Sequence, residues 1–354
     1  MSLTVLSAAI CTLLGAENTA PPPTYSLDSG YYSVITNDRQ LCPPVRDFEV
    51  TYYYYSRANT SNPKVLKIND DNLFTASGFD INLPTKIFVH GFTQMHTSID
   101  AQGVKDAYLS TVDCNLILVD ARVLFAGINY IAAAHNVVPL GEYTAKFVCW
   151  LVSKGMPLSS LELIGMSLGG QTVGIIGQSM QCGKPPKVVA YDPAGPLFTG
   201  LPIDERLDST DGDLVIVIHS NQGFFGYPSN CGDVDFYINT NPYDQPGCHL
   251  VQYLLENSFD VVGYLFCSHN YSWRVAVYAI YHPTAFPARQ CNSSAEYKEG
   301  KCDGNDLQYL GDTVTSSLVA NYKVSRMHSI GEIYNYKLEI ADFDMNCWRL
   351  LILL

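Results

Sequence analysis

Five short apolar runs, separated by stretches with helical or loop character, constrain the fold of this chain more than any other feature. Runs of five or six residues without polar alternation are typical of strands buried on both faces of a parallel sheet. Between the second and third runs, Gly141–Lys154 places Ala145, Val148 and Val152 on one side, which predicts an amphipathic crossover helix. We therefore expect an α/β fold with a mostly parallel central sheet, right-handed crossovers and helices on both faces. The runs are Lys86–His90, Leu116–Asp120, Leu161–Gly165, Val188–Asp192 and Leu214–His219.

Composition excludes two classes of protein. Hydrophobic residues make up 47% of the 354 residues, which excludes a disordered chain. The formal net charge of −13 repels a phosphate backbone, so we do not expect nucleic acid as a partner. Charged residues are scarce at 16% and aromatic residues abundant at 12%, which indicates a surface that tolerates apolar contact.

The first residues predict a secreted protein. The apolar stretch from Leu3 to Leu14 is too short to span a bilayer, and we interpret residues 1–20 as a signal peptide and residues 21–41, which include Pro21–Pro23, as a spacer. A buried N-terminal strand or helix is the alternative, because no basic residue precedes the apolar core. Cleavage would remove Cys11 and leave an even ten cysteines, which suits an oxidising compartment. Possible glycosylation sites are Asn59, Asn270 and Asn292.

A candidate nucleophile follows the third run. Gly165-Met-Ser-Leu-Gly169 joins a predicted strand to an apparent helix, as a nucleophile elbow does, and its serine is Ser167. A glycine-rich packing turn would also explain the motif, so Ser167 needs partners. A serine hydroxyl attacks an ester only when an imidazole removes its proton and a carboxylate orients that imidazole.

The candidate carboxylate is Asp192, which ends the fourth run and precedes Pro193. One helix and one strand fit between Ser167 and Asp192, so both residues are expected at the same sheet edge. The alternative is an aspartate that only forms a turn before proline.

Four downstream histidines are candidates for the base: His219, His249, His269 and His282. We choose His269, because Cys267 nearby can hold its loop in a disulfide and an amphipathic segment, Ser272–Ile280, follows it. His219 is interpreted as a structural histidine at a strand end. For the oxyanion, we expect donation from the backbone N–H groups of Phe92, after the first run, and Leu168, after the serine.

These segments together resemble the pancreatic lipase family, and within it the arthropod neutral lipases and phospholipases A1. The resemblance implies an α/β-hydrolase fold over a catalytic domain at 42–323, with Ser167 as nucleophile, Asp192 as orienting acid and His269 as base. One departure is Ala121, where the family has tryptophan, and it leaves the substrate preference open. The matching segments are Lys86–Phe92, Asn115–Asp120, Leu163–Gly170, Asp192–Pro196, Arg206–Asp208, Gly232–Tyr237, Gln245–Cys248 and Cys267–His269.

The resemblance also implies disulfides. It pairs Cys42 with Cys114, Cys248 with Cys267, and Cys291 with Cys302. We further expect Cys182 to pair with Cys231, Cys149 to be a buried thiol and Cys347 to be left over.

The same resemblance bears on metals and partners. Asp208 and Asp211 resemble a calcium loop, but Ile203 replaces an acidic residue there, so we expect no metal and no cofactor. The C-terminal β-sandwich that binds colipase in the pancreatic enzymes is not expected here, and residues 324–354 form a tail of uncertain structure.

The loop between Cys248 and Cys267 is expected to be a lid. Its eighteen residues approach the length that accompanies triacylglycerol hydrolysis in this family, whereas shorter lids accompany phospholipase A1 action. We expect its apolar side to cover Ser167 in water and to turn towards a lipid surface during catalysis. The alternative is a buried structural loop. The apolar residues that define the lid are Leu250, Leu254, Leu255, Phe259 and Phe266.

The sequence therefore predicts a secreted serine carboxylic ester hydrolase that acts on glycerolipids at a lipid–water interface. Neutral lipids are favoured over phospholipids as substrates. The alternative is a non-catalytic lipid-binding or yolk-like storage protein on the same fold, because fold alone does not dictate function. The presence of Ser167, Asp192 and His269 together favours the enzyme.

Overall fold

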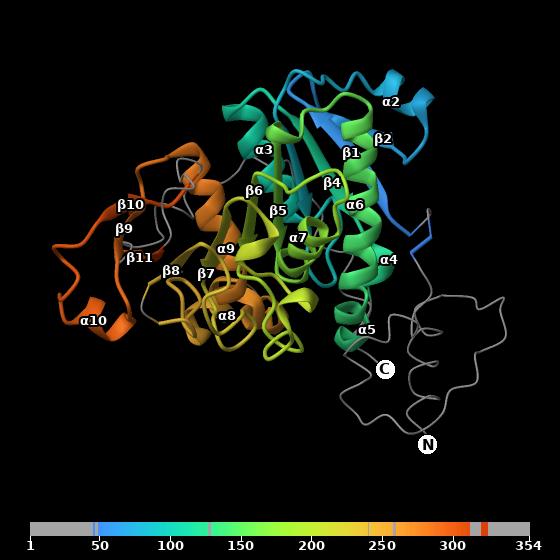
Figure 1. Ribbon diagram of the computed structural model, residues 1–354. Helices are drawn as coiled ribbons and strands as arrows, with labels where there is room; N and C mark the ends of the chain where they lie inside the picture. The colour runs from blue at the N-terminus through green and yellow to red at the C-terminus, as the bar shows by residue number, and fades with distance from the viewer. Residues whose placement is uncertain are drawn as a thin grey trace, which may run out of the picture.

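The computed structural model of the chain describes residues 45–46, 49–126, 129–239, 241–257, 260–311 and 320–324 (Figure 1). The predicted signal peptide, the spacer, Cys42, Phe259, Cys347 and the predicted tail after Val324 lie outside these residues.

An eleven-stranded sheet crosses the molecule in the order β10-β9-β11-β8-β7-β6-β5-β3-β4-β1-β2. Its seven central strands are parallel, and antiparallel strands close both edges. The five predicted apolar runs are the strands β3 to β7, which confirms the mostly parallel α/β sheet. The parallel strands are β3 (Thr85–Val89), β4 (Asn115–Asp120), β5 (Leu161–Met166), β6 (Lys187–Tyr191), β7 (Val215–His219), β8 (Val234–Ile238) and β11 (Ala320–Val324), and the edge strands are β1 (Thr51–Ser56), β2 (Asn59–Leu66), β9 (Pro287–Gln290) and β10 (Leu307–Tyr309).

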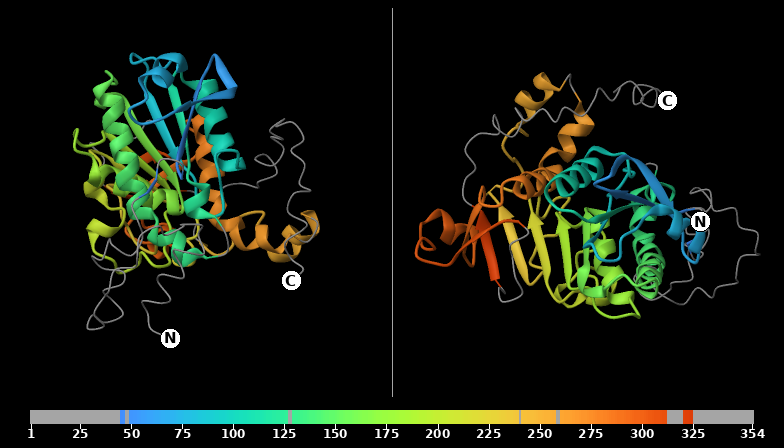
Figure 2. Two further views of the ribbon diagram at one scale, coloured as in Figure 1. Left: turned by 90° about the vertical axis from the view of Figure 1, so that its right-hand side faces the viewer. Right: turned by 90° about the horizontal axis from the view of Figure 1, so that it is seen from above.

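Helices cover both faces of the sheet (Figure 2). The helices α6 (Val137–Ser153) and α7 (Leu168–Ser179) contribute to the apolar core on one face, and α3 (Ile99–Thr111) and α9 (Val261–Tyr281) to the core on the other. Successive strand residues alternate between these two cores, as in β3, where Val89 enters the first and Phe88 the second. The predicted crossover helix is α6, which begins four residues before Gly141.

Shorter helices connect the main elements. They are α2 (Asp71–Ser77), α4 (Arg122–Phe125), α5 (Tyr130–His135), α8 (Leu250–Glu256) and α10 (Ser294–Lys298), with 3-10 turns at Leu158–Ser160, Ile203–Glu205 and Ser209–Asp211. Figure 2 shows α8 and the first turns of α9 projecting away from the layered body.

The parallel strands place the residues that follow them at one edge of the sheet. The strands β3, β5, β6 and β7 are direct neighbours. The chain therefore leaves them side by side at His90, Ser167, Asp192 and Ser220. In an open α/β sheet, this carboxyl edge is where ligands and reacting groups are found.

Candidate functional site

Ser167 lies in a sharp turn between β5 and α7. Its backbone has φ 57° and ψ −117°, a conformation that non-glycine residues rarely adopt. The turn closes tightly because Gly169 carries no side chain: a Cβ atom there would lie 2.0 Å from the carbonyl oxygen of Val89. The Ser167 N–H donates to the Tyr191 carbonyl at 3.0 Å, and the Ser167 carbonyl accepts from the Ala194 N–H at 3.0 Å. These bonds tie the serine to the segment that carries Asp192.

Asp192 and His269 form a buried hydrogen-bonded pair. The distance between Asp192 Oδ2 and His269 Nδ1 is 2.6 Å, and the Asp192 carboxylate is fully buried. Its other oxygen, Oδ1, accepts the backbone N–H groups of Ser220 at 2.9 Å and Asn221 at 3.1 Å. The carboxylate is therefore held on both oxygens and fixes the orientation of the imidazole.

The surroundings of His269 differ from the expectation in one respect. His269 does not precede a helix but lies inside α9, which begins at Val261. The eight residues Val261–Ser268 are already helical, and Asp260 caps the helix by accepting the Gly263 N–H. Aromatic rings lie beside the imidazole: Phe225 is 5.8 Å from His269 between ring centroids, and Phe266 stacks on Phe225 at 4.7 Å.

Two backbone N–H groups near Ser167 have no acceptor among the described residues. They belong to Leu168, at the start of α7, and to Phe92, in the turn after β3. The first N–H groups of a helix have no partner within the helix and are suited to bind an anion. The β3 turn lies close to the serine, because a Cβ atom on Gly91 would be 3.0 Å from Ser167 Cβ.

His90 holds the turn that carries Phe92. Its Nε2 accepts the Ala121 N–H at 3.0 Å, so its Nδ1 carries the proton that is donated to the Gly91 carbonyl at 2.9 Å. Complete burial lowers the pKa of His90 to about 4, so the ring is neutral at physiological pH. His90 therefore fixes the Gly91–Phe92 peptide and does not act as a base.

The side chains of the other three candidate histidines have other surroundings. His219 is buried against Asp235, with Nε2 2.7 Å from Oδ1. His249 is exposed and contacts Asp244, and His282 follows the end of α9. Ser220, whose N–H reaches Asp192, is a site residue that the sequence did not predict. Its position directly after the β7 strand, next to β6, is the signal that could have indicated it.

The segment predicted to be a lid does not turn all of its apolar residues inward. Leu254 packs in a small cluster with Cys248, Tyr253 and Cys267. Other side chains of α8 and the start of α9 face solvent, with exposed fractions of about half or more, namely Leu250 49%, Val251 70%, Val261 56%, Val262 57% and Leu265 47%. This part of the segment therefore presents an apolar surface to solvent. No helix among the described residues is both long and apolar enough to cross a membrane.

Three disulfides are present among the described residues. Cys248 is bonded to Cys267, and Cys291 to Cys302, as the resemblance implied. The third bond joins Cys149 to Cys182.

The proposed Cys182–Cys231 pair and the assignment of Cys149 as a thiol are therefore wrong. The reason is the close packing of α6 on α7, which brings Cys149 and the segment after α7 to a Cα–Cα distance of 5.5 Å. Cys231 and Cys114 are buried and have no disulfide partner within the described residues, and the proposed partner of Cys114, Cys42, lies outside them.

Asp208 and Asp211 cap a 3-10 turn. Asp208 Oδ1 accepts the Thr210 N–H, and Asp211 Oδ2 accepts the Asp208 N–H at 2.8 Å. Each carboxylate keeps one buried oxygen without a partner among the described residues. Burial raises the pKa of Asp211 to about 8.

Comparison with known proteins identifies the family of this chain. A sequence model of the lipase family matches residues 33–325. Mouse "Lipase member H" is 31% identical over 230 residues, 64% of this chain and 49% of that protein, and bovine "Phospholipase A1 member A" is 33% identical over 229 residues, 64% and 48%. The chain thus spans about half the length of these relatives. Among solved structures, the ferulic acid esterase AmCE1/Fae1A from Anaeromyces mucronatus is 16% identical with a TM-score of 0.29, covering 50% of this chain and 74% of that one. Because the family model covers most of the chain, this chain belongs to the lipase family.

Proposed function

We propose that this protein is a carboxylic ester hydrolase that uses Ser167, His269 and Asp192 in an acyl-enzyme mechanism. The observation that carries the proposal is the buried hydrogen bond of 2.6 Å between Asp192 Oδ2 and His269 Nδ1, at the sheet edge where Ser167 is held in its strained turn. A single buried His–Asp pair is common in proteins, but here it accompanies a nucleophile elbow and free oxyanion donors.

Each group has a defined part in the mechanism. His269 Nε2 takes the Ser167 proton as the serine oxygen attacks the ester carbonyl, and Asp192 stabilises the imidazolium that forms. The N–H groups of Phe92 and Leu168 donate to the oxyanion of the tetrahedral intermediate. His269 then gives the proton to the leaving alcohol, and a water molecule activated by His269 cleaves the acyl-enzyme.

The proposed substrates are glycerolipids, with triacylglycerol favoured over phospholipid. The exposed apolar side chains of α8 and the start of α9 support contact with an aggregated lipid. The predicted lid has eighteen residues, which approaches the length that accompanies triacylglycerol hydrolysis in this family, and this favours neutral lipids. The relatives named phospholipase A1 support phospholipid as the second substrate.

We further propose that the protein is secreted. Its three disulfides would persist in an oxidising compartment and would be reduced in the cytosol. The predicted signal peptide at residues 1–20 supports the same compartment.

The test is to assay purified protein on triolein, phosphatidylcholine and p-nitrophenyl butyrate, with Ser167→Ala as the inactive variant. We expect Ser167→Ala to lower hydrolysis by roughly 10³-fold or more, because only oxyanion and binding effects would remain. The double variant Ser167→Ala/His269→Ala should be no worse than Ser167→Ala alone, since the residues act as a unit. A Ser167→Ala variant within tenfold of wild type would contradict the mechanism. Higher activity on phosphatidylcholine than on triolein would reverse the substrate preference.

A further inference from the structure

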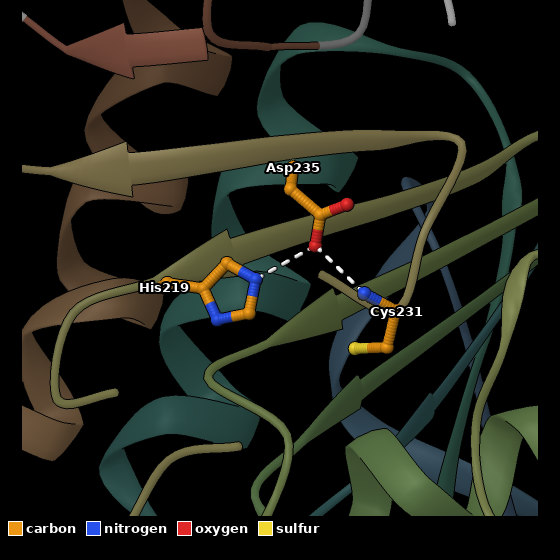
Figure 3. A group of neighbouring side chains, drawn as sticks. All are labelled: His219, Cys231 and Asp235. Atoms are coloured by element: carbon orange, nitrogen blue, oxygen red, sulfur yellow. Dashed lines mark hydrogen bonds and ion pairs between the residues drawn. The ribbon is translucent and has the colours of Figure 1, made fainter. Parts of the chain in front are cut away.

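A second histidine–aspartate pair lies on the adjoining strands β7 and β8, of which β7 neighbours the strand β6 that leads to Asp192. His219 is the last residue of β7, and its Nε2 lies 2.7 Å from Oδ1 of Asp235 (Figure 3). Both side chains are almost fully buried, at 0% and 1% exposure. The His219 ring also stacks on Tyr237, with 4.4 Å between centroids and 8° between planes. The imidazole is therefore held by a hydrogen bond at its edge and by an aromatic ring on its face.

The Asp235 carboxylate also holds the loop that precedes β8. Its Oδ1 accepts the Cys231 N–H at 3.1 Å, and its Oδ2 accepts the Gly232 N–H at 3.2 Å. Figure 3 shows the bonds from Oδ1 to His219 and to the backbone nitrogen of Cys231. One carboxylate thus joins the end of β7 to the loop that leads into β8.

The neighbours of His219 along the chain contact Asp192. The Ile218 carbonyl accepts the Asp192 N–H at 2.7 Å, and the Ser220 N–H donates to Asp192 Oδ1 at 2.9 Å. His219 stands between these two contacts. Ser220 also donates its hydroxyl to the His269 carbonyl at 3.1 Å. The end of β7 therefore contacts both the proposed acid and the proposed base, while its histidine binds Asp235 on the next strand.

Two other interpretations of the pair fit the structure less well. The ligand atoms of His219, Asp235 and Cys231 lie within 4.8 Å of one another, as a metal site would require. However, His219 and Asp235 are hydrogen-bonded directly to each other, and both oxygens of the aspartate also accept backbone N–H groups. The ligand atoms that a metal would need are therefore already engaged. A cavity of about 10 Å³ borders His219, which is too small for a ligand larger than water.

We propose that His219 and Asp235 are positioning residues that hold the β7 end, and with it the Ser220 and Asn221 N–H groups, in register with Asp192. This inference rests on the function proposed above, because it assigns Asp192 as the orienting acid. Loosening the pair should let the Asp192 carboxylate turn, so that His269 is oriented less well. The chemical step should then suffer more than substrate binding.

The main variant is Asp235→Asn, which keeps the side-chain shape and one acceptor oxygen and so favours folding. We expect kcat on p-nitrophenyl butyrate to fall about tenfold or more with KM within twofold of wild type. The matched control is Cys231→Ala, which removes a buried side chain in the same loop but leaves its backbone bond to Asp235. The control should lower the melting temperature and leave kcat unchanged. Equal kcat for the two variants would overturn the proposal.

Changes at His219 give a rescue series. His219→Leu removes the donor to Asp235, whereas His219→Gln keeps an N–H group that can reach the carboxylate. We expect kcat to be higher in His219→Gln than in His219→Leu, even where both variants lower the melting temperature by the same amount. Equal loss of kcat in both variants would contradict a role that depends on the hydrogen bond.

A spectroscopic measurement separates this proposal from the proposed activity. The Nδ1 proton of His269, hydrogen-bonded to Asp192, should give a downfield proton NMR signal, assigned by its absence in His269→Ala. In Asp235→Asn this signal should move upfield or broaden, and in Cys231→Ala it should stay. An unmoved signal in Asp235→Asn overturns the positioning role whether or not the protein hydrolyses esters. Absence of Ser167-dependent hydrolysis in wild type, with the signal shift present, would instead refute only the proposed function.

Discussion

Gly226 lies directly against the carboxylate of Asp192, so that a Cβ atom at position 226 would be 2.4 Å from Oδ1. No real Cβ contact is that short. Gly226 cannot move away freely, since its N–H donates to the Asn221 carbonyl at 3.0 Å and its carbonyl accepts the Gly223 N–H at 2.9 Å. Asp192 cannot move freely either, because His269 binds its other oxygen.

Replacing Gly226 with alanine should therefore displace the Asp192 carboxylate. We expect kcat for a soluble ester to fall about 10²-fold, since a shift of about 1 Å in an active-site group can cost that much. The measurement is steady-state kinetics on p-nitrophenyl butyrate together with thermal unfolding. The control is Gly304→Ala, because a Cβ atom at Gly304 would meet nothing within 4 Å. If Gly226→Ala kept wild-type kcat, the local packing would not constrain Asp192 as described.

Features encoded locally in the sequence could be predicted before the structure. The apolar runs gave the central strands, and the turns after them gave Ser167 and Asp192, because a strand buried on both faces and a tight turn each leave a pattern within a few residues. His269 could be chosen from its neighbours, but the start of its helix could not, since Asp260 caps it from outside the expected segment.

Contacts between distant segments could not be predicted in the same way. Gly226 and Ser220 matter because of where β7 and its loop lie relative to Asp192, which no short pattern records. The Cys149–Cys182 bond likewise depends on how α6 packs on α7. The polar edge strands β9 and β10 lack a long apolar run and depend on pairing with their neighbours.

Asp100 should make stability depend on pH. It is fully buried in the first turn of α3, and neither of its carboxylate oxygens has a hydrogen-bond partner among the described residues. Burial raises its pKa to about 7, whereas the unfolded chain releases this proton near pH 4. Between these values only the folded state keeps the proton. The free energy of unfolding should therefore fall as pH rises, by up to about 1.4 kcal/mol per unit, and level off above pH 7.

Urea unfolding of Asp100→Asn at pH 5, 6, 7 and 8 checks this contribution. The stability of the variant relative to wild type should rise from pH 5 to 7 and then stay constant, because asparagine cannot ionise. The control is Asp106→Asn, on the same helix, whose side chain is 37% exposed. Parallel pH curves for wild type and Asp100→Asn would show that Asp100 is ionised in the folded protein.

Chelation should leave activity largely unchanged. Asp208 and Asp211 offer only two free carboxylate oxygens, whereas calcium takes about six to eight oxygen ligands, and their other carboxylate oxygens accept backbone N–H groups. We expect hydrolysis of p-nitrophenyl butyrate after EDTA treatment to match the untreated protein. Complete loss that calcium restores would establish a site at this turn, and Asp208→Asn should then abolish the restoration.

The exposed apolar side chains of the lid should matter only for aggregated lipid. Val251 on α8, with Val261 and Val262 at the start of α9, are 56% to 70% exposed, so replacing all three with serine should change stability little. On emulsified triolein we expect a drop of about tenfold or more, because each buried apolar side chain adds about 1.5 to 3 kcal/mol to contact with an apolar phase. Hydrolysis of monomeric p-nitrophenyl butyrate should stay within twofold of wild type, because Ser167, His269 and Asp192 are untouched.

The control is Val65→Ser on the edge strand β2 of the sheet. Val65 is 41% exposed, and its replacement should affect neither substrate. Equal loss on both substrates would mean that these residues support the fold of the site, and no loss on either would mean that lipid contacts the protein elsewhere.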